Sequence, residues 1–154
     1  MRITFYDTRI GEDDSTILIK EKAVNYSSEV PNTPEKIVCM MKQLLDMDKL
    51  AEEHCYMLAM NTACRIIGVF FLTKGTVNRS PIGPREVFLR ALLIGASQFI
   101  ICHNHPSQNA TPSKSDLCLT EQLKSTGELI GISLADHIII GGDKYFSFKN
   151  AALL

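Results

Sequence analysis

The sequence predicts an α/β protein in which a mixed β-sheet is flanked by helices, with a short β-hairpin at the N-terminus. Short apolar stretches typical of strands alternate along the chain with longer stretches of helical periodicity. Strands that alternate with helices favour a sheet with helices packed on its faces. The chain has 154 residues, of which 45% are hydrophobic, so it can bury the core of one ordinary domain.

The first thirty residues are predicted to be a hairpin appended to a main domain that spans residues 31–154. Residues 3–28 alternate between apolar and polar side chains, and the turn-like GEDDS separates two such stretches. The main domain opens with a helix in PNTPEKIVCMMKQLLDMD. In this helix Thr33 can cap the N-terminus and Pro34 fits the first helical position.

The remaining elements follow from local signals. Pro84 fits the start of a helix, and the apolar run QFIIC predicts a strand buried on both faces. A further helix is expected from about Ser113 to Ser125. The other predicted strands are HCYMLAMN, RIIGVFFLTKGT, LADHIIIGG and KYFSFKN, the first two joined by a turn at Thr62–Ala63.

The charge and the cysteines limit the possible partners. A formal net charge of −1 does not support nucleic acid as a partner, because phosphate-binding domains are usually basic. The five cysteines are odd in number and form no C-x-x-C pair, which favours reduced thiols over a disulfide framework. We find no signal-peptide core and no apolar run long enough to span a membrane. We therefore expect a cytoplasmic protein with no membrane partner.

The stretch ICHNHPSQNATPSKSD, residues 101–116, carries the predicted chemistry. His103 and His105 follow an apolar run, and residues two apart on a strand point to the same face. Asp116 lies in the first turn of the next predicted helix and is the candidate third ligand. Two histidines and a carboxylate leave one tetrahedral position open, as in catalytic zinc sites, where the metal lowers the pKa of water to about 7. The sequence therefore predicts one Zn2+ ion.

Other interpretations of this stretch are simpler. Ser113 and Asp116 also match a capping box, which needs no metal, and the histidines could be ordinary polar residues of a loop. Their combination in one short window favours the metal site, and a capping serine could also hold the helix that carries the aspartate. The zinc motif H-E-x-x-H and the zinc-deaminase pattern are absent. The letters HNH alone do not reproduce the dispersed motif of HNH nucleases.

The pattern H-x-H-P, followed by S-x-x-D with its aspartate eleven residues after the second histidine, resembles the metal signature of JAB/MPN (JAMM) metalloproteases. The segments GPREVFLRALLIGASQFIICHNHPS, PSKSD and LADHIIIG resemble the RadC-like branch of that family. The resemblance covers roughly residues 30–154 and implies a JAB/MPN-type fold with α-β-α layers. It also implies that His103, His105 and Asp116 bind zinc, and that Ser113 positions water or stabilises the oxyanion.

The resemblance further implies a catalytic glutamate near the start of a strand, and Glu53 in EEHCYML matches it best. Glu53 would take a proton from water and pass it to the leaving amine. Glu52 is an alternative, because a shift of one residue exchanges the faces of a strand. Glu86 is a third candidate, although the first turn of a helix favours a negative charge for structural reasons. His137, in ADHIII, also fits the family. It could lie close to the site, but we expect a hydrogen-bonded histidine at a strand start.

The sequence departs from the RadC-like pattern in two places. Gln108 stands where these chains usually have a glycine after HNHPS, and glycine often serves a tight or positive-φ turn. We therefore expect this loop to bend differently or to narrow the cleft. The N-terminal hairpin stands where a helix-hairpin-helix region is often found, which weakens the association of the family with DNA repair for this chain.

These features together predict a zinc metallopeptidase-type hydrolase that cleaves an amide, peptide or isopeptide bond in a peptide or protein substrate. One alternative is a DNA-repair-associated or nucleic-acid-processing factor, against which the net charge argues. Another is a non-catalytic protein-binding JAB module, although such modules usually lose metal ligands that this chain retains. The hairpin could offer an edge strand to a second copy of the chain, so a homo-oligomer is a further expectation.

Overall fold

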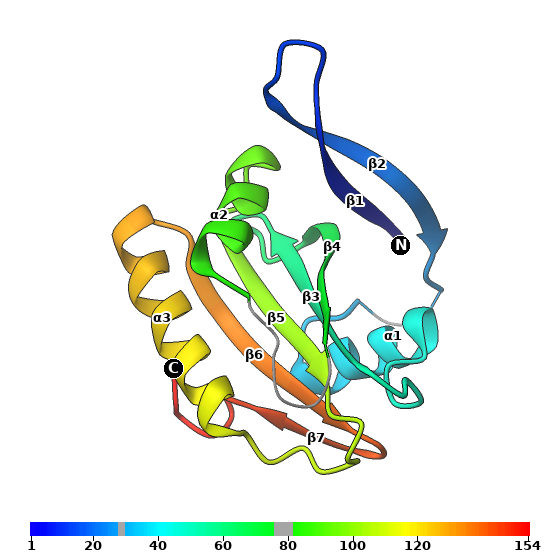
Figure 1. Ribbon diagram of the computed structural model, residues 1–154. Coiled ribbons are helices and arrows are strands. Elements are labelled where there is room, and N and C mark those ends of the chain that lie inside the picture. Colours follow the sequence, from blue (N-terminus) through cyan, green and yellow to red (C-terminus); the bar gives the residue numbers. More distant parts are fainter. Residues whose placement is uncertain (28–29, 76–81) are drawn as a thin grey trace.

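The computed structural model describes residues 1–27, 30–75 and 82–154. Its strands form a seven-stranded mixed sheet in the order β2-β1-β4-β3-β5-β6-β7 (Figure 1), which confirms the predicted fold class. In this part of the chain no helix is long and apolar enough to cross a membrane. The elements are β1 (Arg2–Ile10), β2 (Thr16–Asn25), α1 (Pro34–Leu45), β3 (Glu53–Met60), β4 (Ile66–Gly75), α2 (Pro84–Leu93), β5 (Gln98–Asn104), α3 (Lys114–Ile130), β6 (Ser133–Gly141) and β7 (Lys144–Ser147).

Helices cover both faces of the sheet, with α1 on one face and α2 and α3 on the other (Figure 1). Alternation along the strands supplies both cores, since Ile100 of β5 packs in the core beneath α1 whereas Ile101 packs in the core beneath α2 and α3. Cys102 lies in the α1-side core, on the face opposite His103, as expected from strand alternation. Together the two cores make the predicted α-β-α layers.

The predicted helix starts are confirmed, and one predicted helix end is wrong. Thr33 caps α1 by accepting a hydrogen bond from the backbone N–H of Lys36, and Pro34 is the first helical residue. Helix α3 continues past the expected end near Ser125 and stops only at Gly131, which has a φ of 82°. Gly127 is an interior residue of this helix. A Cβ there would come within 2.5 Å of the Ile132 carbonyl oxygen, so this position requires glycine. It serves close packing and does not end the helix.

The N-terminal hairpin forms as predicted and is joined to the sheet at its base. β1 pairs with β2 along its whole length, but it pairs with β4 only through Phe5 and Tyr6. Beyond Tyr6 the hairpin projects away from the sheet (Figure 1). Ile3 and Phe5 are buried in the α1-side core, so the base of the hairpin contributes to the main sheet. Its separation as an appendage ending at residue 30 stays a prediction.

The loop between β5 and α3 carries the predicted site and lies tightly against the end of β6. β5 is longer than the predicted run and extends to Asn104. A Cβ on Gly141 would come within 2.5 Å of the Ala110 backbone nitrogen and 2.9 Å of the Gln108 carbonyl oxygen, so only glycine allows this approach. Gln108 has a φ of 63°, which places a glutamine in the left-handed region that glycine favours. The loop therefore adopts a positive-φ turn despite the missing glycine.

We predict that Gln108→Gly is more stable than Gln108→Ala by about 0.5–1 kcal/mol. Both variants lose the side-chain amide and its hydrogen bond to Asp48 and differ only in the Cβ atom, so their difference isolates the backbone conformation. The left-handed conformation costs about 1–2 kcal/mol for a residue with a Cβ, and the greater entropy of glycine in the unfolded chain offsets part of this gain. Urea unfolding of the two variants measures the difference. Equal midpoints and slopes would show that the turn is unstrained.

Candidate metal centre

The three predicted ligands meet where β5 ends and α3 begins. His103 is the penultimate residue of β5, His105 follows the strand, and Asp116 lies in the first turn of α3. The Nε2 atoms of His103 and His105 are 3.1 Å apart. Asp116 Oδ1 lies 3.3 Å from the first of these nitrogens, and Oδ2 lies 3.3 Å from the second. One atom of each side chain thus faces a common point.

This arrangement fits a small metal ion. A tetrahedral zinc site with bonds of about 2.0–2.2 Å holds neighbouring ligand atoms roughly 3.3–3.5 Å apart, close to the distances between these three groups. Two imidazole nitrogens and a carboxylate oxygen also suit first-row divalent metals. The side chains of His103 and Asp116 are 3% and 10% exposed, so the surrounding protein holds them in place. His103, His105 and Asp116 could therefore hold a metal ion.

The electrostatics of the centre favour a positive charge between the three side chains. Burial opposes the charged form of Asp116, but hydrogen bonds with His103 and His105 outweigh it and hold the pKa of the carboxyl well below its usual range. The hydrogen bond with Asp116 raises the pKa of His105, although burial opposes this rise. Both shifts stabilise a cation at the same position, which a proton and a metal ion would compete to fill.

Asp116 belongs both to the capping box and to the candidate metal site. Ser113 Oγ accepts a hydrogen bond from the Asp116 backbone N–H at 3.2 Å. Asp116 Oδ2 accepts hydrogen bonds from the Ser113 N–H and from its hydroxyl, each at 2.7 Å. These bonds hold one oxygen of the carboxylate and direct the carboxylate toward the histidines. The only hydrogen of the Ser113 hydroxyl is thereby directed to Asp116.

A backbone carbonyl orients His105. Its Nδ1 lies 2.7 Å from the carbonyl oxygen of Asn109, and a carbonyl oxygen can only accept a hydrogen bond. Nδ1 therefore carries the hydrogen in the neutral ring, and Nε2 presents its lone pair to the centre. An outer hydrogen bond of this kind is the usual way in which proteins orient a metal-binding histidine.

Two further residues, His137 and Thr120, contact the candidate ligands on the side buried in the protein. His137 was expected at a strand start, but it lies within β6, fully buried and stacked on Phe148. Its Nε2 is 2.9 Å from His103 Nδ1, and its Nδ1 is 2.7 Å from Thr120 Oγ1. Burial lowers the pKa of His137 well below the usual value. Thr120 also donates a hydrogen bond to the Asp116 carbonyl oxygen at 2.6 Å.

No motif in the sequence indicated Thr120. Thr120 follows Asp116 by four residues, so the two occupy one face of α3. That spacing was the available signal. It becomes informative only once His137 is known to lie beneath the same face, which depends on how β6 pairs with β5.

Of the three candidate glutamates, Glu53 is the one whose charge acts on the predicted ligands. Cys55 lies opposite His103 in the pairing of β3 with β5, and residues two apart share a face of a strand. Glu53 therefore lies on the face that carries the metal centre. Its charge adds to the rise in the pKa of His105, which is due first to the hydrogen bond with Asp116.

The other two glutamates are engaged elsewhere. Glu52 forms an ion pair with Lys74 near the end of β4. Glu86 is 3.6 Å from Arg85 at the start of α2, and its carboxylate lies over Gly83. Both contacts are those of exposed structural charges.

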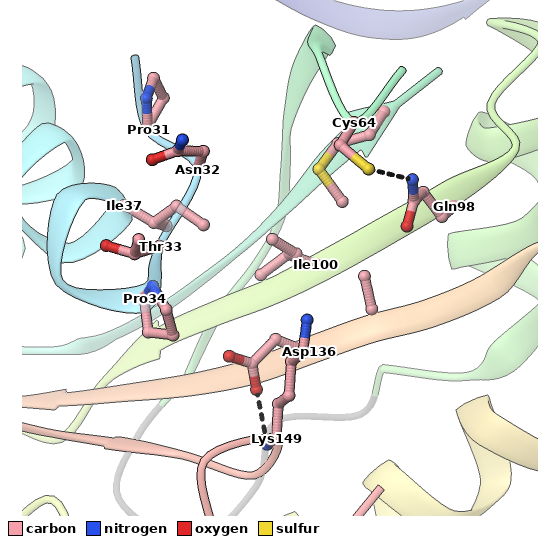
Figure 2. A pocket seen from close by; sticks show the side chains of 12 residues that line it. Pro31, Asn32, Thr33, Pro34, Ile37, Cys64, Gln98, Ile100, Asp136 and Lys149 are labelled. Carbon is pink, nitrogen blue, oxygen red and sulfur yellow. Dashed lines mark hydrogen bonds between the residues drawn. The ribbon is translucent and has the colours of Figure 1, made fainter. Parts of the chain in front are cut away.

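A separate pocket lies on the α1 face of the sheet (Figure 2). The carboxylate of Asp136 borders it and accepts hydrogen bonds from the Ser147 hydroxyl and the Lys149 backbone N–H. The pocket shares no lining residue with the metal centre. Its lining residues are Pro31, Asn32, Thr33, Pro34, Ile37, Met60, Cys64, Gln98, Ile100, Ala135, Asp136 and Lys149.

Comparison with known proteins agrees with the fold. Residues 31–153 match the family described as RadC-like JAB domain. A UPF0758 protein of Thermotoga maritima is 43% identical over 124 residues, which cover 79% of this chain and 56% of that protein. A UPF0758 protein of Clostridium beijerinckii is 36% identical over 133 residues, which cover 86% of this chain and 57% of that protein.

The chain spans about half the length of these curated relatives, and the match to the family begins after the N-terminal hairpin. The matched region contains every strand of the sheet from β3 to β7, together with the three helices and the three candidate ligands. The chain therefore belongs to the RadC-like JAB domain family.

Proposed function

We propose that this chain is a zinc-dependent hydrolase of the JAMM type that cleaves an amide, peptide or isopeptide bond with activated water. The observation that carries the proposal is the convergence of two imidazole nitrogens and a carboxylate on one point, next to a strand that begins with Glu53. Such a ligand set leaves a coordination position for water or substrate, which distinguishes catalytic zinc sites from closed structural ones.

His103, His105 and Asp116 would hold the ion, and zinc is proposed because nitrogen and oxygen ligands in a compact cluster suit it. When bound, zinc supplies a Lewis acid that polarises a carbonyl group and makes water acidic near neutral pH. The chain's own contribution is to hold the three ligands rigidly. The capping box at Ser113 supports this rigidity, because it fixes the side chain of Asp116 to the start of α3.

Glu53 is proposed as the proton carrier. A carboxylate beside the site can accept a proton from the attacking water and then deliver it to the leaving nitrogen. The position of Glu53 on the ligand-bearing face of β3 supports this role, as does its effect on the pKa of His105 after that of Asp116.

Ser113 is proposed to assist the oxyanion. Its hydroxyl hydrogen is directed to Asp116 Oδ2 at 2.7 Å, so this role requires the hydrogen to turn toward the substrate when substrate binds. A donor aimed at a developing oxyanion contributes a few kcal/mol to catalysis. Between turnovers the same hydroxyl would position Asp116.

The proposed substrate is a peptide or protein. A net charge of −1 favours this class over nucleic acid, whose binding usually requires a basic surface. We propose this substrate for the domain alone, since the chain spans about half the length of its relatives.

We predict that the purified protein contains close to stoichiometric zinc and that His103→Ala abolishes this content. The substitution removes one of three protein ligands, which a site with so few cannot replace. His54→Ala is the matched control, because His54 lies against Phe71, with ring centroids 5.6 Å apart, and is not a ligand. Elemental analysis after dialysis measures the metal. A parent protein without zinc, or equal contents in both variants, would refute the zinc site.

We predict that Glu53→Gln lowers peptidase activity by about 10²–10⁴-fold, the usual contribution of general acid–base catalysis, and leaves the zinc content unchanged. Glu52→Gln should retain activity, since Glu52 is paired with Lys74. A peptide-library screen identifies a cleaved substrate, on which both variants are then compared. A Glu53→Gln variant as active as the parent would exclude the proposed role. Salt-dependent DNA binding without peptide cleavage would favour the nucleic-acid alternative.

A further inference from the structure

A buried chain of hydrogen bonds connects two of the candidate ligands through residues that are not ligands. It runs from the ring of His103 in β5 through His137 in β6 to the hydroxyl of Thr120 in α3, and it ends at the backbone carbonyl of Asp116. The exposed fractions of His103, His137 and Thr120 are 2%, 0% and 3%, so water does not offer these groups alternative partners. The donors and acceptors of these buried groups must therefore pair with one another.

The carbonyl at its end fixes the direction of every bond in the chain. The Asp116 carbonyl can only accept, so the single hydroxyl hydrogen of Thr120 is used there. Toward His137 the threonine oxygen must then accept, which places a hydrogen on His137 Nδ1. In the neutral ring His137 Nε2 is consequently an acceptor, and its hydrogen bond with His103 requires a hydrogen on His103 Nδ1.

This direction leaves His103 Nε2 with a free lone pair, and Nε2 is the atom that faces His105 and Asp116. We propose that Thr120 and His137 are positioning residues, which fix the tautomer of His103 so that its Nε2 is ready to bind the metal ion. The inference rests on the proposed function only for the identity of the ion. It adds two residues from β6 and α3 to a centre whose ligands come from β5, its loop and α3.

Removal of the Thr120 hydroxyl would reverse the direction of the hydrogen bond between His137 and His103. Without that oxygen, a hydrogen on His137 Nδ1 would be buried without a partner, which is costly. His137 would instead place its hydrogen on Nε2 and donate it to His103 Nδ1. His103 would then carry its hydrogen on Nε2, directed into the centre, and this hydrogen would have to leave before a metal ion could bind.

The test compares Thr120→Val, which keeps the shape and removes the hydroxyl, with Thr120→Ser, which keeps the hydroxyl. Zinc affinity is measured by competition with a chelator. We expect Thr120→Val to bind zinc about 10–100-fold more weakly, the usual effect of losing an outer hydrogen bond at a metal site, and Thr120→Ser to bind like the parent. Ser147→Ala is the matched control. Ser147 is 3% exposed, and its hydroxyl donates to Asp136 and takes no part in the hydrogen bonds between His103, His137 and Thr120.

A second readout requires neither metal nor activity. The 15N chemical shifts of the histidine rings in the metal-free parent report which nitrogen carries the hydrogen. We expect hydrogens on Nδ1 of both His103 and His137, and Thr120→Val should move them to Nε2. Hydrogens on Nε2 in the parent, or unchanged zinc affinity in a folded Thr120→Val, would overturn the inference. If Thr120→Val does not fold, the parent spectrum alone decides.

The outcomes for this inference and for the hydrolase are separable. A protein with the expected tautomers and zinc affinities but no peptidase activity would support the positioning residues and refute the hydrolase. An active zinc peptidase with hydrogens on the Nε2 atoms would do the reverse.

Discussion

The buried carboxylate of Asp116 is the group on which the rest of the site depends. A carboxylate removed from water is expensive unless hydrogen bonds or opposite charges compensate it. Here Ser113 donates to it twice, and both histidine rings face its two oxygens. The backbone carbonyl of the same residue also accepts from Thr120. Asp116 thus orders its surroundings through its side chain and its main chain together.

The topology of the sheet makes this arrangement possible. β5 and β6 run parallel, and a parallel pair requires a crossover connection, which α3 provides. In the register of the two strands, His103 lies opposite Ile139. His137 is two residues before Ile139 and so shares the face of His103. Because α3 packs on that face, its first turns bring Asp116 and Thr120 over both histidines.

The sequence predicted those parts of the fold and the site that are set by neighbours along the chain. The cap at Thr33, the capping box of α3 and the alternation of His103 and Cys102 are local features, and each needs only a few consecutive residues. The ligand set was also predictable, because its members lie within fourteen consecutive residues. The left-handed turn at Gln108 was indicated only through the glycine that the resemblance to RadC-like chains implies there.

The remaining features depend on contacts between distant segments. The nearness of Glu53 to His105 follows from the register of β3 against β5, and that of His137 to His103 follows from the pairing of β5 with β6. Periodicity within one strand does not determine either register. Gly127 in α3 is different, because the atom that it accommodates, the carbonyl oxygen of Ile132, lies just after the same helix. A single sequence shows the glycine but not the atom that it accommodates.

The centre also differs in kind from small zinc modules, which fold only when metal binds. The two apolar cores on either side of the sheet consist of hydrophobic side chains, so neither core depends on a metal ion. The raised pKa of His105, due first to its hydrogen bond with Asp116, means that a proton can supply the positive charge that the cluster favours. Since a proton can take the place of the ion, the ligands can be ordered before metal arrives. A metal ion that bound there would exchange with a proton at a site that the fold has already built.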